Sequence, residues 1–309
     1  MMMQPGRSGK DPRHMTNTTS AHVLIDTHTH IVSPDTNRYP QRGQVLANGA
    51  WWSGVDCSFE SLVAEVGQSD VDGVVLVQAA GPYGADNTYL TDTLGATDHQ
   101  FLGVGVVDPA EGAVERLKAL AAAGLAGVRL FAIPYSAPGW LAGPVGNELI
   151  DTSADLGITV GVCCQPEALD DLAIQLQRRP DVTMVLDHCG FADFRDGPPF
   201  SAAQPLWDLA SHNNLVLKFT PTLVRLNDAQ PDQLLQALVD HFDADRIVWG
   251  SDWPQHREVD EHGRQLSYVE QVDRIVSWMT ELSPQQQQLI AGQNALRLFP
   301  GMFTTPGAP

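Results

Sequence analysis

The sequence predicts an α/β protein with a single (β/α)8 barrel. Eight short apolar runs recur along the chain, each bounded by turn residues and followed by a segment with helical periodicity. Continuous apolar strands that alternate with helices are typical of a parallel sheet covered by helices. Eight such units favour closure into a barrel, and 309 residues are enough for a fold that commonly takes about 250. An open doubly wound sheet is the alternative, but no glycine-rich nucleotide loop follows the first strand.

The first unit begins with a strand over Val23–His30, where an apolar run ends in the sequence DTHTH. The polar loop at 33–56 that follows is long enough to cover a site. Ser58 is placed to cap a helix through Val66, and Ser283 precedes the last helix in the same way. Apolar runs predict the remaining strands at 71–80, 100–108, 125–131, 157–165, 182–190, 215–220 and 246–254. Helical periodicity predicts helices at 86–99, 110–123, 146–156, 167–178, 204–213, 230–242, 266–282 and 284–299.

The domain organisation follows from these elements. We expect a disordered leader at 1–21, a barrel at 22–300 and a tail at 301–309, with Met15 as an alternative start. The leader is polar and lacks the apolar core of a secretory signal. No apolar run is long enough to cross a bilayer. Four cysteines without a CxxC spacing fit reduced thiols in a cytoplasmic protein.

The charge balance restricts the possible partners. Thirty-seven acidic residues against 18 basic ones give a formal charge of −19. This balance disfavours nucleic acids and anionic membranes as partners. An anionic substrate would need a local group of Arg or Lys.

Candidate site residues lie where the predicted strands end, which is where (β/α)8 barrels build their active sites. His28 and His30 are two apart in a strand and therefore point the same way. His188 lies at the end of the sixth strand and Asp252 at the end of the eighth. Taken singly, each could be a hydrogen-bonded structural histidine or a turn cap, but together they favour a functional site. Further candidates to face a substrate are Arg129, Gln165, Lys218 and Trp253 in or after strands, with Arg225 and Arg257 on later loops.

Four motifs carry a family resemblance: DTHTH at 26–30, LDHCG at 186–190, WGSDWP at 249–254 and NALRLF at 294–299. In this order they resemble the amidohydrolase superfamily. More narrowly, they are similar to the amidohydrolase-related branch that includes 2-pyrone-4,6-dicarboxylate lactonase and sugar lactonases. The resemblance spans Val23 to Phe299 and implies a hydrolase on a (β/α)8 barrel.

One departure from the superfamily pattern concerns metal binding. Metal-dependent members usually add a ligand, commonly His, after strand five, where this chain has Gln165, and neutral Gln is a poor zinc ligand. Strand four supplies Arg129, which cannot bind a cation. His28, His30, His188 and Asp252 could still hold one zinc ion by ligand count. A metal-free site is favoured, as the lactonase end of the family implies, and zinc stays possible.

The expected reaction is hydrolysis of a lactone that carries a carboxylate. Asp252 would act as the general base for water, and the three histidines would donate hydrogen bonds to the oxyanion. Arg129 would bind a substrate carboxylate in bidentate fashion, unless it is ion-paired within the interior. Lys218 would add a positive charge or neutralise Asp252 or Asp187, with Arg225 and Arg257 as candidates for a second carboxylate.

Two other readings stay open from the sequence. One is a zinc-dependent decarboxylase or hydratase that acts on aromatic-derived acids, and the other is a non-catalytic small-molecule binding barrel. Trp253 could pack in the interior rather than stack on a substrate. The loops at 33–56 and 191–203 are expected to shape the pocket, and a homo-oligomer is possible.

Overall fold

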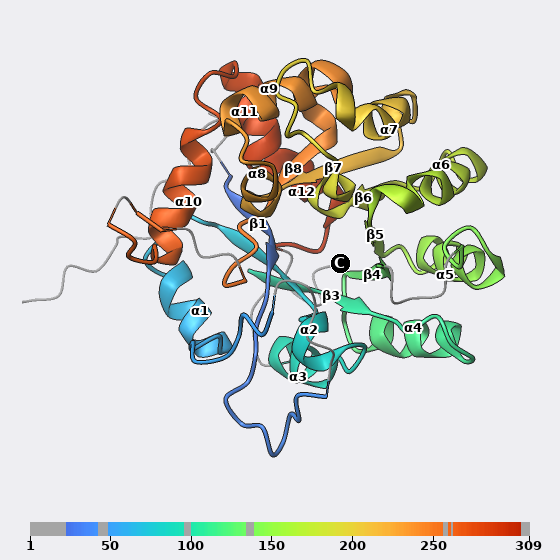
Figure 1. The fold of residues 1–309 in the computed structure, drawn as a ribbon. Coiled ribbons are helices and arrows are strands. Elements are labelled where there is room, and N and C mark those ends of the chain that lie inside the picture. Colours follow the sequence, from blue (N-terminus) through green and yellow to red (C-terminus); the bar gives the residue numbers. More distant parts are fainter. Residues whose placement is uncertain are drawn as a thin grey trace, which may run out of the picture.

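Eight parallel strands form the centre of the molecule in this computed structural model, which describes residues 23–42, 49–95, 100–133, 139–255, 259–260 and 262–303. The expected leader and residues 304–309 of the expected tail lie outside the described residues. Hydrogen bonds join the strands in chain order, and Figure 1 shows them surrounded by helices. The strands are β1 (Ile25–Thr29), β2 (Gly73–Val77), β3 (Phe101–Val106), β4 (Gly127–Ala132), β5 (Thr159–Cys164), β6 (Met184–Leu186), β7 (Leu215–Phe219) and β8 (Ile247–Trp249).

Residues directly after β8 close the barrel against β1. The backbone N–H of Asp252 donates to the carbonyl of His28 at 2.8 Å. The N–H of His30 in turn donates to the carbonyl of Trp253 at 2.6 Å. Glycine is required at position 250, because a Cβ there would lie 2.5 Å from the Cβ of His28. The predicted (β/α)8 barrel is confirmed, and its seam runs through the DTHTH and WGSDWP motifs.

The helices surround the barrel largely where periodicity places them. Ser58 and Ser283 cap their helices as predicted, each accepting a hydrogen bond from the backbone N–H three residues on. The α-helices are α1 (Phe59–Val66), α2 (Ala80–Tyr83), α3 (Thr88–Leu94), α4 (Ala113–Ala122), α5 (Pro144–Asp155), α6 (Leu169–Arg178), α7 (Gln204–Trp207), α8 (Pro221–Asn227), α9 (Pro231–Phe242), α10 (Tyr268–Ser277), α11 (Pro284–Gln288) and α12 (Asn294–Leu298). A π-helical turn, Leu289–Gln293, joins the last two within the predicted helix at 284–299.

Two strands end earlier than predicted, and one helix was not predicted. The sixth strand was expected to reach Gly190 but ends at Leu186, because a left-handed turn follows. The eighth strand was expected to reach Pro254 but ends at Trp249. Helix α8 was not predicted, and it begins directly after β7 with a proline in its first turn. All three differences lie at the carboxyl ends of strands.

The barrel interior is apolar toward the amino ends of the strands and polar at their carboxyl ends. The inward side chains form a separate cluster of small β-branched residues that includes Val185, Val216 and Val248, and Phe299 and Met302 near the chain's end pack onto it. Because side chains alternate along a strand, the inward position two residues after Val216 is Lys218. The polar side chains described below therefore stand on an apolar layer.

Two further sequence expectations concern the whole chain. All four cysteines are free and buried. Within the described residues, no helix has the length and apolar character needed to cross a bilayer.

Candidate active site

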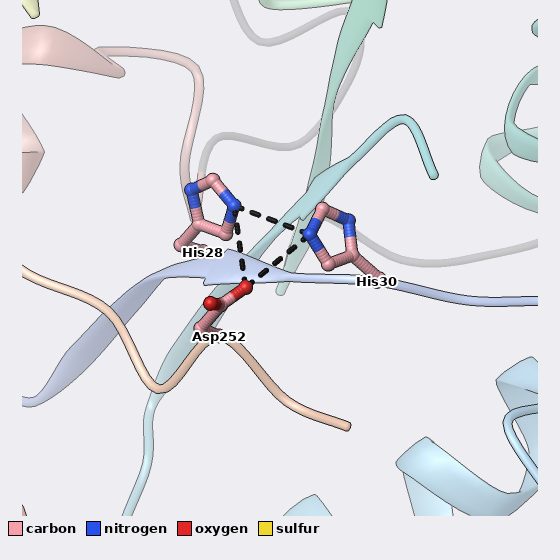
Figure 2. A group of neighbouring side chains, drawn as sticks. All are labelled: His28, His30 and Asp252. Carbon is pink, nitrogen blue, oxygen red and sulfur yellow. Dashed lines mark hydrogen bonds and ion pairs between the residues drawn. The ribbon is translucent and has the colours of Figure 1, made fainter. Parts of the chain in front are cut away.

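Three of the predicted site residues meet at the carboxyl end of the barrel. The Nε2 atoms of His28 and His30 are 3.3 Å apart, and Asp252 Oδ1 lies 3.7 Å from the first and 3.4 Å from the second. Figure 2 shows the two rings and the carboxylate facing one another. All three side chains are buried, and their ligand atoms lie within 4.8 Å of one another.

A backbone carbonyl fixes the tautomer of His30. Its Nδ1 lies 2.8 Å from the carbonyl oxygen of Val77, at the end of β2. A carbonyl oxygen only accepts, so Nδ1 carries the proton and donates it. In the neutral imidazole, Nε2 then has no proton and presents a lone pair to His28 and Asp252.

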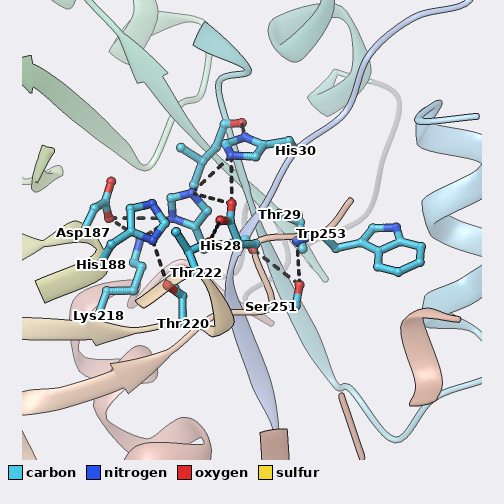
Figure 3. A network of polar contacts seen from close by, with 12 residues as sticks. His28, Thr29, His30, Asp187, His188, Lys218, Thr220, Thr222, Ser251 and Trp253 are labelled. Carbon is cyan, nitrogen blue, oxygen red and sulfur yellow. Dashed lines mark hydrogen bonds and ion pairs between the residues drawn. The ribbon is translucent and has the colours of Figure 1, made fainter. Parts of the chain in front are cut away.

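A buried ion cluster lies on the other side of His28. Asp187 Oδ2 accepts from Nε of Arg129 at 2.6 Å, and its Oδ1 lies 2.9 Å from Nζ of Lys218. Burial alone would raise the pKa of Asp187, but Lys218 and Arg129 outweigh it and hold that pKa well below its usual range. Figure 3 shows Asp187 and Lys218 beside His28. The cluster therefore contains one carboxylate between two cations.

Lys218 also sets the tautomer of His28. Its Nζ lies 3.2 Å from His28 Nδ1. An ammonium group only donates, so Nδ1 accepts and the ring proton is on Nε2. Burial first and the charge of Lys218 second hold the pKa of His28 well below its ordinary value, so the ring stays neutral. The proton on Nε2 points toward His30 and Asp252. Lys218 thus donates to His28, His28 to His30, and His30 to the carbonyl of Val77.

His188 reaches the site from an unusual backbone conformation. Residues 188–190 all have positive φ, 52° at His188. The turn aims the ring at His28, with 4.9 Å between the ring centroids, and Nδ1 lies 2.8 Å from the hydroxyl of Thr220. Its nitrogens are not part of the close group formed by His28, His30 and Asp252. Burial lowers the pKa of His188 to about 4.

Asp252 is oriented by a contact to its side chain and by contacts that hold the preceding residue. Its backbone has a φ of 55°, which turns the chain back over β1. The hydroxyl of Thr222, in α8, donates a short hydrogen bond to Asp252 Oδ2. The preceding residue, Ser251, is held by Asp26, whose Oδ1 accepts from its backbone N–H at 2.9 Å. Oδ2 of Asp26 accepts from the hydroxyl of Tyr268 at 2.9 Å, so β1 and α10 both fix the segment that carries Asp252.

The other predicted substrate contacts are placed less centrally. Arg129 points its Nε at Asp187, and a second guanidinium nitrogen lies 3.3 Å from the sulfur of Cys163. Gln165 is half-buried at the end of β5, and Trp253 is buried against Tyr268. Arg225 is exposed on α8. Arg257 lies outside the described residues.

Two aromatic side chains border the imidazoles. Trp51, in the loop at 33–56, has its ring centroid 5.6 Å from that of His30. Phe191, in the loop at 191–203, lies 5.1 Å from the ring of His188. Each of the two loops thus brings one aromatic ring against a candidate histidine, and that these loops shape the pocket stays a prediction; residues 43–48 are outside the described part.

Sequence reasoning did not select several residues that contact the candidate set. Asp187, which precedes His188 in LDHCG, was named only as a possible partner of Lys218, and that pairing is confirmed. Thr220 and Thr222 lie in a segment with no recognised motif, and their role depends on the undetected helix α8. Nothing in the sequence pairs Trp51 with His30.

The comparison with known proteins decides the family. The model of the family described as Amidohydrolase matches residues 25–301, almost the whole chain outside the leader and tail. The chain belongs to the amidohydrolase family. The resemblance drawn from the four motifs is confirmed, as is the prediction of an amidohydrolase-related enzyme.

Curated relatives of this amidohydrolase include two enzymes named for lactones. The chain is 26% identical over 247 residues to L-fucono-1,5-lactonase of Burkholderia ambifaria, covering 75% of this chain and 81% of that protein. It is 24% identical over 280 residues to 4-sulfomuconolactone hydrolase of Hydrogenophaga intermedia, covering 89% and 88%.

Solved structures share the fold. A Pseudomonas putida protein provisionally assigned as a 2-pyrone-4,6-dicarboxylic acid hydrolase superposes with a TM-score of 0.72 at 24% identity, covering 92% of this chain and 99% of that one. An amidohydrolase from Burkholderia multivorans, solved with bound zinc, gives a TM-score of 0.70 at 21% identity, covering 90% and 99%.

Proposed function

We propose that this amidohydrolase opens the ring of a small lactone that carries an acidic group. The single observation on which this rests is the position of Asp252, a buried carboxylate 3.4 Å from Nε2 of His30 at the carboxyl end of the barrel. The lactone-hydrolysing relatives support the substrate class. A lactone is an activated ester, so its hydrolysis needs a general base and a site for the oxyanion.

Asp252 is assigned as the general base. Thr222 holds its Oδ2, so Oδ1 is the oxygen that faces the two imidazoles and would take the proton from water as the water oxygen bonds to the carbonyl carbon. When the acyl C–O bond of the ring then breaks, Asp252 would return this proton to the departing ring oxygen. His30 presents beside it an Nε2 without a proton, which accepts from His28 in this structure and would accept the second O–H of the same water once His28 donates to the lactone carbonyl instead. This assignment changes the role expected for His30, since a nitrogen without a proton cannot donate to an oxyanion.

His28 and His188 are assigned as the groups that polarise the lactone carbonyl. The Nε2 proton of His28 points into the site because Lys218 occupies its Nδ1. If the hydroxyl of Thr220 donates to Nδ1 of His188, that ring likewise presents an Nε2–H. Both rings stay neutral at ordinary pH because burial lowers the pKa of each. Neutral N–H donors aimed at a developing oxyanion are an established source of catalysis.

Arg225 is the best-placed described residue for a carboxylate on the substrate. It is one turn after Thr222 on α8, and residues three apart on a helix share a face. The exposed Arg225 therefore lies on the side of α8 that contacts Asp252. Arg129 is less suited, because Asp187 and Cys163 already contact two of its three guanidinium nitrogens.

The group formed by His28, His30 and Asp252 has the ligand types and the spacing of a zinc site. The environment of His28 does not fit a metal, however, because Lys218 faces its Nδ1 with a cationic donor. No step of the proposed reaction uses a metal. A zinc-dependent reaction of an aromatic-derived acid is the competing function, favoured by the three-ligand group and by the zinc bound in the Burkholderia multivorans amidohydrolase.

The test is a panel of lactones, and hydrolysis of each is measured by the protons that it releases. The panel compares neutral sugar lactones, carboxylated sugar lactones and carboxylated unsaturated lactones, each with and without chelator. We expect turnover of an acidic lactone that is unchanged by the chelator. Loss of turnover after chelation, restored by zinc, would support the zinc-dependent alternative, and an inactive enzyme across the panel would contradict the lactonase proposal.

A further inference from the structure

We infer that Lys218 keeps divalent metal ions out of the group formed by His28, His30 and Asp252. The inference concerns metal affinity alone and does not depend on which substrate the enzyme hydrolyses. It follows from where the ammonium group lies and from the charges that are buried with it.

A metal ion at this group would need the opposite tautomer of His28. Nε2 must offer its lone pair to the ion, so the ring proton must move to Nδ1. Metal-bound histidines almost always donate that second N–H to a carboxylate, a carbonyl or water. Asp187 Oδ1 is the nearest carboxylate oxygen, 3.7 Å from Nδ1.

Lys218 blocks this arrangement. Its Nζ is 2.9 Å from Asp187 Oδ1 and 3.2 Å from His28 Nδ1, so it contacts both the acceptor and the nitrogen that would have to donate. With a metal bound, the Nδ1–H of His28 would face a second donor. The chain thus has a metal-type ligand group whose supporting carboxylate is already paired with a lysine.

The buried charge leads to the same conclusion. Arg129 and Lys218 balance Asp187 and Asp252, and all four side chains are at most 5% exposed. A divalent ion would add two positive charges beside this balanced, buried set. Uncompensated buried charge is strongly unfavourable, so the ion would have to displace one of the existing cations.

The test changes Lys218 and measures zinc directly. Lys218→Met removes the ammonium and lets His28 Nδ1–H turn toward Asp187. Lys218→Gln is the second variant, because its amide oxygen can itself accept from Nδ1–H. Each protein is purified without chelator, its zinc content is measured by mass spectrometry, and its affinity is measured by calorimetric titration of the apoprotein. We expect both variants to bind zinc about 10–100-fold more tightly than the wild type, the range typical of partners in the second coordination layer.

Arg129→Met is the matched control. Arg129 pairs with the same carboxylate, but its guanidinium nitrogens contact Asp187 and Cys163 rather than His28. We expect this variant to gain much less zinc affinity than Lys218→Met. An equal gain would show that net charge alone decides, and would overturn the role assigned to the His28 contact.

Two other results would overturn the inference: stoichiometric zinc in the wild type, or no gain in folded Lys218→Met and Lys218→Gln. Circular dichroism and thermal melts establish folding. Because the readout is metal content, failure of the lactone panel leaves this inference standing, and failure here leaves lactone hydrolysis open.

Discussion

Replacing Asp252 with Asn tests the proposed chemistry most directly. The substitution removes the group that accepts a proton and keeps the shape of the side chain. Asn also tolerates the left-handed backbone at this position, where φ is 55°. Its carbonyl can accept from Thr222, and its NH2 can donate to the unprotonated Nε2 of His30. The hydrogen bonds around the site can therefore be retained.

The expected effect is large on the rate and small on the fold. A positioned general base contributes about 10²- to 10⁴-fold, which is about 3–5 kcal/mol of activation free energy at 1.36 kcal/mol per decade. The assay follows proton release from the best lactone of the panel in weak buffer, with thermal melts as the control. The assignment would be refuted by a variant that melts like the wild type and keeps kcat within about tenfold of it.

Three further variants test the groups around Asp252. Thr222→Val should lower kcat by roughly 10- to 100-fold, since a hydrogen bond to a charged group is worth about 1.5–3 kcal/mol. Thr222→Ser keeps the hydroxyl and should keep most of the activity, so an equal loss of kcat in both variants would contradict an orienting hydroxyl. His188→Asn removes a ring whose pKa is about 4 in the folded protein and 6.5 in a model peptide. Between these pH values the unfolded wild type binds more protons, so lowering the pH from about 6.5 to about 4 should reduce its stability by up to about 3 kcal/mol more than that of the variant. Equal pH profiles in urea titrations would argue against a buried neutral ring. Tyr268→Phe should cost about 1–3 kcal/mol of unfolding free energy, because a buried oxygen of Asp26 loses its hydrogen-bond donor. Its kcat should be nearly unchanged, and a large fall in kcat would mean that Asp26 does more than hold the backbone.

The fold and the main site residues could be predicted because they follow strand periodicity. His28 and His30 lie two apart in β1, so alternation alone puts both rings on one side. The apolar runs mark all eight strands, and the rule that barrel sites lie at carboxyl ends brings Asp252 to the histidines. These inferences need no knowledge of loop conformation.

What could not be predicted depends on conformations and pairings that leave no periodic signal. His188 and Asp252 lie just after β6 and β8 and have positive φ, yet neither residue type requires it. Helix α8 spans only seven residues, so it is too short to show a clear apolar face. Arg129 was expected either to face a substrate or to be ion-paired in the interior, and the structure shows the ion pair. Its partner could not be named from periodicity, because Arg129 lies in β4 and Asp187 directly after β6, two strands along the sheet.

The net charge of the chain does not decide which substrates it can bind. The formal charge is −19, but exposed charges farther away than about 8 Å are largely screened at physiological salt. Within the site, Arg129 and Lys218 compensate Asp187 and Asp252, so a substrate anion meets a balanced group rather than a negative one. Selectivity for an acidic lactone must then come from a cation at the rim, which is the role assigned to Arg225. A chain this acidic can therefore accept an anionic substrate where a guanidinium at the rim, the role proposed for Arg225, is within reach.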